Sequence, residues 1–253
     1  MTATDTRAPA RPRRSLLDRN TAMRLAATEY GRYLDLLRSL DEADWARPTD
    51  CPPWDVRAMT GHCLGMAEFA ASLPTFVHQN AAATRRGGVP VDALTDLQVH
   101  QRRDLTPEQL IARYAAVAPR AVRGRRRRSL LVGRVAMPGT QTVGGVPERW
   151  TFGYLFETIL TRDTWMHRVD TARATGRDLV LTPEHDGVIV ADVVAEWAGR
   201  HGRPYALTLT GPAGGRWTAG EGPEMQLDAV EFCRILSGRT AAPAGLLATQ
   251  VPF

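Results

Sequence analysis

Apolar side chains recur at alternating steps of three and four residues near the start of the chain. Between Ser15 and Leu40 they form one stripe, made up of Met23, Ala26, Tyr30, Tyr33, Leu37 and Leu40. This spacing predicts an amphipathic helix, because positions three and four apart share one helix face. A second helix is expected from Asp55, its N-cap, as far as Pro74, which ends or bends it.

Further helices are predicted downstream, separated by breaks rich in glycine and proline. One covers 93–104, and a capping box at 106–109 opens another, which Pro119 is expected to close or bend. A long helix is predicted over about 147–175. The expected breaks lie at 45–54, 84–92 and 132–146. Several long helices in succession favour an antiparallel bundle.

The pattern changes after Gly176. Short apolar or alternating segments predict strands at 178–181, 205–209, 214–219 and 225–227. Helices are expected at 185–202 and 230–236, the second capped by Asp228 and closed by Gly238. This mixture is typical of a small α+β unit.

The chain has 253 residues, of which 43% are hydrophobic, so it can bury a sizeable core. We expect three parts: a disordered start over 1–14, a helical bundle over 15–176 and a small α+β domain over 177–253. The predicted fold class is therefore α+β.

The net charge of +5 arises from 32 basic residues, all of them arginine. The densest run, Arg123–Arg128, is predicted to be a solvated helix end or the loop beside it. No aromatic residues interleave this run and no nucleic-acid motif accompanies it. An accessory role on nucleic acid therefore stays open only as a weaker alternative.

Cysteine usage and the N-terminus indicate a cytoplasmic protein. The three cysteines form no CxxC pair and no disulfide framework, which fits a reducing compartment. The first fourteen residues have no apolar core of the kind found in secretory signals. No apolar run approaches the roughly 20 residues that a bilayer span needs.

The clearest candidate chemistry lies in the predicted 147–175 helix. Asp163 and His167 are four residues apart, so they lie about 40° apart on one helix face. With His62 from another helix as a third ligand, they would form a facial metal site with open positions. Ordinary contacts between helical side chains remain the alternative. Cys63 is directed away from its neighbour His62 on a helix and is assigned to the core.

Three motifs carry a resemblance to a known family. The first comprises Trp45, Thr49, Pro52, Trp54, Val56, Arg57, Gly61 and His62. The second comprises Asp163, Trp165, His167 and Asp170. The third comprises Leu236, Ser237, Gly238 and Arg239 with Leu247, Val251, Pro252 and Phe253. In these motifs the chain resembles the mycothiol-dependent maleylpyruvate isomerase family, within the DinB-like metal-binding bundles, over nearly its whole length.

The resemblance implies a DinB-like four-helix bundle followed by a small α+β domain. By matching position, it implies that His62, Asp163 and His167 are ligands of Zn²⁺ or another divalent metal. It also implies mycothiol as the thiol cosubstrate. Mycothiol is the thiol of actinobacteria, and the arginine-only basic composition agrees with such a host.

One departure from the family concerns Asp163. The family's isomerases have glutamate there, and aspartate is one methylene shorter. The metal must therefore approach the helix backbone, or a water must bridge. We expect a retained metal site that is weaker or differently tuned. The alternative is a metal-depleted bundle that serves as a non-catalytic small-molecule-binding protein.

The expected activity is the conversion of a thiol to a thiolate that adds to a small electrophile, giving cis–trans isomerisation or S-transfer. Asp170 is expected to orient a ligand or pair with an arginine, with a surface carboxylate as the alternative. Arg239 is a candidate for holding a substrate carboxylate. The expected partners are a small-molecule electrophile, such as an unsaturated organic acid, and a low-molecular-weight thiol. No nucleic-acid or membrane partner is expected, and the chain is predicted to be a monomer or a homodimer.

Overall fold

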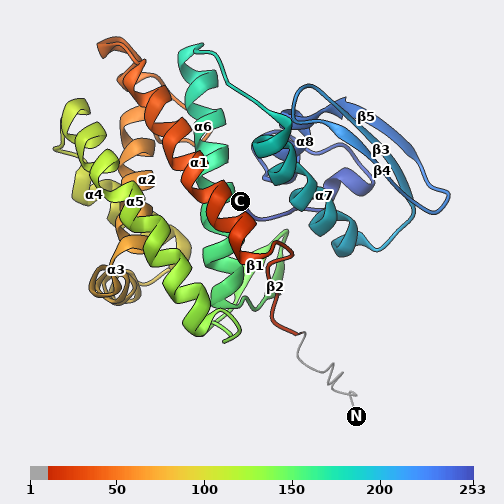
Figure 1. Cartoon of the computed structure of the whole chain (residues 1–253), viewed down its shortest axis with the longest axis horizontal. Coiled ribbons are helices and arrows are strands. Elements are labelled where there is room, and N and C mark those ends of the chain that lie inside the picture. The colour runs from red at the N-terminus through yellow and green to blue at the C-terminus, as the bar shows by residue number, and fades with distance from the viewer. Residues whose placement is uncertain (1–10) are drawn as a thin grey trace.

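A computed structural model of the chain describes residues 11–253. Four helices pack as the bundle predicted from the sequence: α1 (Arg19–Arg38), α2 (Val56–Ala71), α5 (Pro107–Val132) and α6 (Leu160–Thr175) (Figure 1). Two further helices, α3 (Leu73–Arg86) and α4 (Pro90–Arg102), pack on α2. The α+β fold class is confirmed, because a small three-stranded sheet follows this bundle.

Side-chain caps explain where the bundle helices begin. The Asp55 carboxylate accepts a hydrogen bond from the backbone N–H of Ala58 at 2.7 Å and starts α2 as predicted. The capping box of Thr106 and Gln109 starts α5, again as predicted. Helix α2 ends at Ala71, before Pro74, and that proline occupies the first turn of α3.

Pro119 does not close its helix, which was one of the two outcomes expected for it. Helix α5 continues through it to Val132. Proline inside a helix costs about 3 kcal/mol. Buried α5 side chains such as Leu110, Tyr114 and Ala121 offset this cost, because each packs into the bundle core.

The arginine run 123–128 lies inside α5, not at a helix end or in a loop. Arg125 has 0% of its surface exposed. Its guanidinium donates to the carbonyl of Phe156 at 2.7 Å and to the hydroxyl of Thr161 at 2.5 Å. Arg128 lies over the ring of Phe156, 5.1 Å from its centroid. Two of the arginines in the run therefore hold α5 against the start of α6.

The segment between α5 and α6 is not simply a loop. Strands β1 (Gln141–Val143) and β2 (Val146–Glu148) form a hairpin whose turn is Gly144-Gly145, both with positive φ. The predicted start of the next helix at 147 was therefore too early. A π-helical segment, η2 (Tyr154–Ile159), leads into α6.

The C-terminal unit contains η3 (Pro183–Gly187), α7 (Val188–His201), α8 (Ala229–Leu236) and η4 (Leu246–Ala248). Its sheet has the order β4-β3-β5, from β3 (Tyr205–Thr210), β4 (Gly215–Ala219) and β5 (Glu224–Asp228). Strand β3 is antiparallel to β4 and parallel to β5. Helices α7 and α8 lie between this sheet and the bundle (Figure 1).

The strand predicted at 178–181 is not present. The carbonyl of Val180 accepts hydrogen bonds from the guanidinium groups of Arg168 and Arg32. Arginine side chains thus take the place of a neighbouring strand, and the segment connects the two units as irregular backbone. The predicted boundary at 176/177 coincides with the end of α6, where Gly176 adopts the left-handed conformation. The division into domains stays a prediction.

Buried ion pairs join α6 to the C-terminal unit. Arg162 donates to Asp192 and to Glu196, each at 2.7 Å. Arg168 pairs with Glu29 of α1 and with Asp186, both at 2.6 Å. The C-terminal segment returns to the same helix, where the ring of Phe253 stacks on Trp165. Helix α6 is therefore held from both sides over the turns that carry the candidate site.

The expected disordered start lies outside the described residues as far as position 10. Residues 11–14 differ from that expectation, because the backbone of Arg13 pairs with Arg149 and Thr151. No helix among the described residues has the length and apolar character needed to cross a bilayer.

Candidate metal centre

The three residues predicted as metal ligands come together between α2 and α6. Nε2 of His62 lies 3.3 Å from Oδ1 of Asp163, and Nε2 of His167 lies 3.4 Å from the same oxygen. Their potential ligand atoms all lie within 4.8 Å of one another. The two histidines are buried, and Asp163 is only slightly exposed.

Hydrogen bonds on the far side of each ring determine which nitrogen faces the centre. Nδ1 of His62 lies 2.9 Å from Oε1 of Gln98. Nδ1 of His167 lies 3.3 Å from Oδ2 of Asp170. Both partners are acceptors, so both Nδ1 atoms donate, and in the neutral rings both Nε2 atoms present lone pairs to the Asp163 carboxylate. Three electron-pair donors facing one another require a shared cation, either protons or a metal ion.

The residues present fit a divalent metal. Two neutral imidazoles and a carboxylate form a donor set suited to Zn²⁺. Ligand atoms about 2.1 Å from a tetrahedral ion lie about 3.4 Å apart, which matches the observed spacings. Oδ2 of Asp163 is buried and has no hydrogen-bond partner among the described residues. The shorter aspartate side chain therefore reaches both imidazoles directly and keeps a second oxygen free.

The electrostatics keep Asp163 ionised. Burial alone would raise the pKa of its carboxyl group, but positive charge on the adjacent His62 and His167 imidazoles outweighs burial and holds that pKa well below its usual range. An ionised carboxylate supplies the single formal charge of the ligand set. This state is the one that metal binding requires.

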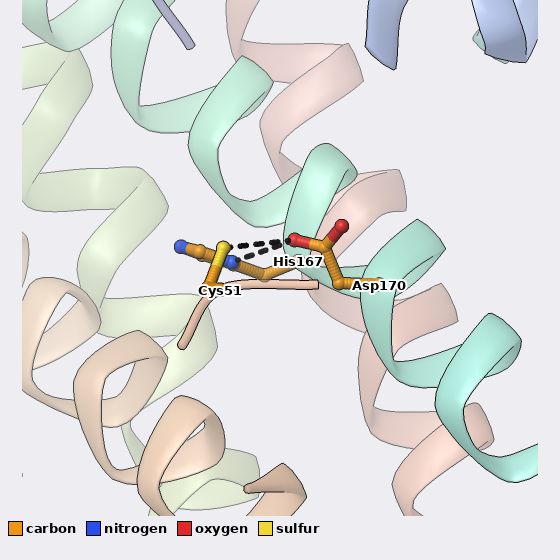
Figure 2. A group of neighbouring side chains, drawn as sticks. All are labelled: Cys51, His167 and Asp170. Carbon is orange, nitrogen blue, oxygen red and sulfur yellow. Dashed lines mark hydrogen bonds and ion pairs between the residues drawn. The ribbon is translucent and has the colours of Figure 1, made fainter. Parts of the chain in front are cut away.

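Asp170 lies behind His167. Figure 2 shows that one of its carboxylate oxygens accepts hydrogen bonds from both His167 and Cys51. The Sγ of Cys51 lies 3.6 Å from this oxygen, and Nε of Arg239 donates to the carboxylate at 2.8 Å. Asp170 is 0% exposed, so the alternative of a surface carboxylate is wrong. Burial opposes its ionisation, but the His167 hydrogen bond and the Arg239 charge keep its pKa lowered.

Arg239 reaches the centre from the C-terminal unit. Gly238 has a φ of 80° and reverses the chain after α8, and the N–H of Arg239 then bonds to the carbonyl of Arg234. Among its guanidinium nitrogens, only Nε of Arg239 donates to Asp170. Its two terminal nitrogens have no hydrogen-bond acceptor among residues 11–253, and 12% of the side chain is exposed. A planar donor pair is thus free to meet a carboxylate.

Sequence reasoning missed three residues at this centre. Trp54 was given no role beyond its place in the first motif, and its ring lies 5.1 Å from His62 and 6.0 Å from His167 between centroids. Cys51 had no assigned role, and Gln98 belongs to no motif. The available signals were the place of Cys51 and Trp54 in the loop before α2 and the small residues flanking His62. Cys63 is buried, and burial raises its thiol pKa to about 12, so its assignment to the core agrees with the structure.

Comparisons with known proteins converge on one family. The family model for the mycothiol maleylpyruvate isomerase N-terminal domain matches residues 26–172. A crystal structure of the mycothiol-dependent maleylpyruvate isomerase is similar to this chain with a TM-score of 0.54 and 18% identity, covering 89% of this chain and 91% of that chain. A histidine-to-alanine mutant of such an isomerase gives a TM-score of 0.53 with the same identity and coverage. None of the curated proteins matches the sequence significantly.

Proposed function

The chain belongs to the mycothiol-dependent maleylpyruvate isomerase family, and we propose that it uses mycothiol to isomerise a small cis-unsaturated organic acid. The observation that carries the proposal is the convergence of two imidazole Nε2 atoms on Oδ1 of Asp163. We propose that His62, Asp163 and His167 hold Zn²⁺ or another divalent ion. When bound, that ion supplies Lewis acidity that favours the thiolate form of a thiol ligand.

The surrounding residues prepare this centre for thiol chemistry. Gln98 and Asp170 orient the two imidazoles, and Asp163 contributes one negative charge. Two neutral imidazoles and one carboxylate leave a divalent centre with a net positive charge, which favours an anionic sulfur ligand. Trp54 packs against both rings and limits the access of water from the loop side.

The proposed isomerisation needs no oxidant or reductant. The thiolate sulfur forms a bond to one alkene carbon, and the π electrons move onto the conjugated carbonyl group. The former double bond rotates as a single bond, and expulsion of the thiolate restores the alkene in the trans form. Arg239 holds a carboxylate of the acid through its two free nitrogens while rotation occurs at the other end. The thiol is recovered unchanged.

The test combines metal-replete protein, mycothiol and a panel of cis-unsaturated acids and epoxides. Proton NMR follows the cis and trans acids, and a thiol reagent measures free sulfhydryl. We expect cis-to-trans conversion with no net loss of thiol, abolished in His167→Ala and retained in His78→Ala, an exposed histidine outside the ligand set. Loss of one thiol per product would identify an S-transferase that uses the same nucleophile. Tight binding of acids without any conversion would instead support the non-catalytic alternative.

A further inference from the structure

Gln98 is buried beside the candidate centre, with 0% of its surface exposed, and it is the partner of His62 on α4. We propose that Gln98 is a positioning residue that fixes the His62 ring with Nδ1 protonated and Nε2 available to a metal ion. The inference rests on the proposed metal centre and adds to it a residue outside the ligand motifs.

The orientation of the Gln98 amide follows from its other neighbours. Its Nε2 donates to Oε1 of Gln79 at 2.9 Å and approaches Sδ of Met66 at 3.0 Å. The Met66 sulfur can only accept a hydrogen bond, so a flipped amide would turn the carbonyl oxygen of Gln98 toward this sulfur and lose the contact. The chain of hydrogen bonds from α3 through α4 to α2 therefore directs Oε1 of Gln98 at His62 and selects one tautomer.

Gly65, three residues after His62 on α2, lets α4 come close enough for the Gln98–His62 contact. A Cβ atom added at Gly65 would lie 2.6 Å from Cγ and 2.7 Å from Cβ of Gln98, far inside ordinary contact. At Gly61, one helical turn before Gly65, an added Cβ would lie 3.5 Å from Cβ of Arg102, which is an ordinary contact. Gly65 is thus required for the Gln98–His62 hydrogen bond, whereas Gly61 tolerates a methyl group.

The two imidazoles are supported by different chemistry. Asp170 places a carboxylate behind His167, whereas Gln98 places a neutral amide behind His62. The amide orients the His62 ring without adding a further negative charge to those of Asp163 and Asp170. Outer partners of metal-bound histidines typically change metal affinity 10- to 100-fold when they are removed.

The first experiment measures zinc affinity by competition with a chromogenic chelator. Gln98→Leu keeps the side-chain volume but removes the acceptor, and we expect its zinc dissociation constant to rise about 10- to 100-fold. Gln98→Glu keeps an acceptor at the same position and should restore affinity to within a few-fold of the wild-type value. Gln101→Leu, on the exposed side of α4, is the matched control and should bind zinc as the wild type does.

The second experiment does not depend on activity, and it adds a variant that leaves Gln98 itself unchanged. Gly65→Ala displaces Gln98 and should weaken zinc binding as Gln98→Leu does, while Gly61→Ala should not. In zinc-loaded protein with ¹⁵N-labelled histidine, NMR should show slowly exchanging Nδ1–H protons on both His62 and His167. Gln98→Leu and Gly65→Ala should lose the His62 proton and retain that of His167.

The outcomes separate this inference from the proposed function. Wild-type protein that binds no zinc would overturn the metal centre, and the role of Gln98 with it. Wild-type protein that binds zinc, with unchanged affinity and an unchanged His62 Nδ1–H signal in Gln98→Leu and Gly65→Ala, would overturn the role of Gln98 alone.

Discussion

His62 and Asp163 lie 101 residues apart in the chain, yet His62 Nε2 and Asp163 Oδ1 are 3.3 Å apart. The contact joins α2 to α6 inside the bundle. A ring lone pair and a carboxylate repel each other, so a proton or a metal ion must lie between these two atoms.

Asp163→Asn tests the charge at the centre while keeping the shape of the side chain. Removing the only carboxylate from the ligand set should weaken zinc binding by about two orders of magnitude, because the ligand set loses its only negative charge. Isothermal titration calorimetry measures the change. Asp178→Asn, an exposed position outside the centre, is the control. Equal zinc affinity in Asp163→Asn and wild type would remove Asp163 from the ligand set.

Arg239→Gln tests recognition of the substrate carboxylate. Loss of a charge-assisted bidentate contact should lower kcat/KM about 10- to 100-fold, with metal content unchanged. Arg239→Lys should recover little of the lost kcat/KM, because an ammonium group cannot pair with both Asp170 and a substrate carboxylate in the same planar way. Steady-state kinetics with matched metal analysis measures both. Arg203→Gln, which replaces an exposed arginine of the C-terminal unit, is the control and should behave as wild type. Full activity of Arg239→Gln would show that Arg239 does not hold the substrate carboxylate.

Arg125→Met tests the interior position of the arginine run. The substitution leaves the Phe156 carbonyl without its donor and should destabilise the fold by about 2–4 kcal/mol. The neighbouring exposed Arg126→Met should change the free energy of unfolding by less than about 0.5 kcal/mol. Urea denaturation followed by circular dichroism gives both values. Equal stability of the two variants would contradict the burial of Arg125.

Glu196→Gln tests how the junction between α6 and α7 depends on pH. Burial raises the pKa of Glu196, but Arg162 and the Tyr154 hydroxyl outweigh burial and lower it overall. A lowered native pKa stabilises the fold above the unfolded pKa of about 4.3, and this stabilisation is lost as pH falls through the native pKa. The free energy of unfolding of the wild type should therefore exceed that of Glu196→Gln by about 3 kcal/mol at pH 7. This difference should shrink below about pH 4.

The matching measurement is urea denaturation of both proteins from pH 7 to pH 3. Glu221→Gln, at an exposed turn, should show no pH-dependent difference from wild type. A gap between wild type and Glu196→Gln that stays constant over this range would show that the Glu196 charge does not stabilise the junction.

Local signals predicted much of the fold and the two ligand helices. Asp55 and the capping box at 106–109 act through backbone atoms within one turn, so their effect can be inferred from neighbouring residues alone. The i, i+4 spacing of Asp163 and His167 likewise places both side chains on one face. The family resemblance, carried by these motifs, is confirmed by the family model.

The departures from these predictions came from interactions over long sequence distances. Pro119 remains helical because distant bundle residues pack against α5, and Arg125 is buried because the Phe156 carbonyl and Thr161 accept its hydrogen bonds. Gln98 belongs to no local pattern, and only the close approach of α4 to Gly65 brings it to His62. Cytoplasmic location and the choice between monomer and homodimer stay predictions.

The most direct test of the metal centre is the metal content of the purified protein, measured by inductively coupled plasma mass spectrometry. We expect about one equivalent of zinc or another divalent metal per wild-type chain. His62→Ala and His167→Ala should each retain almost none, while His78→Ala should retain a full equivalent. Full metal occupancy in both ligand variants, or a wild-type protein that takes up no divalent metal, would rule out the proposed metal centre.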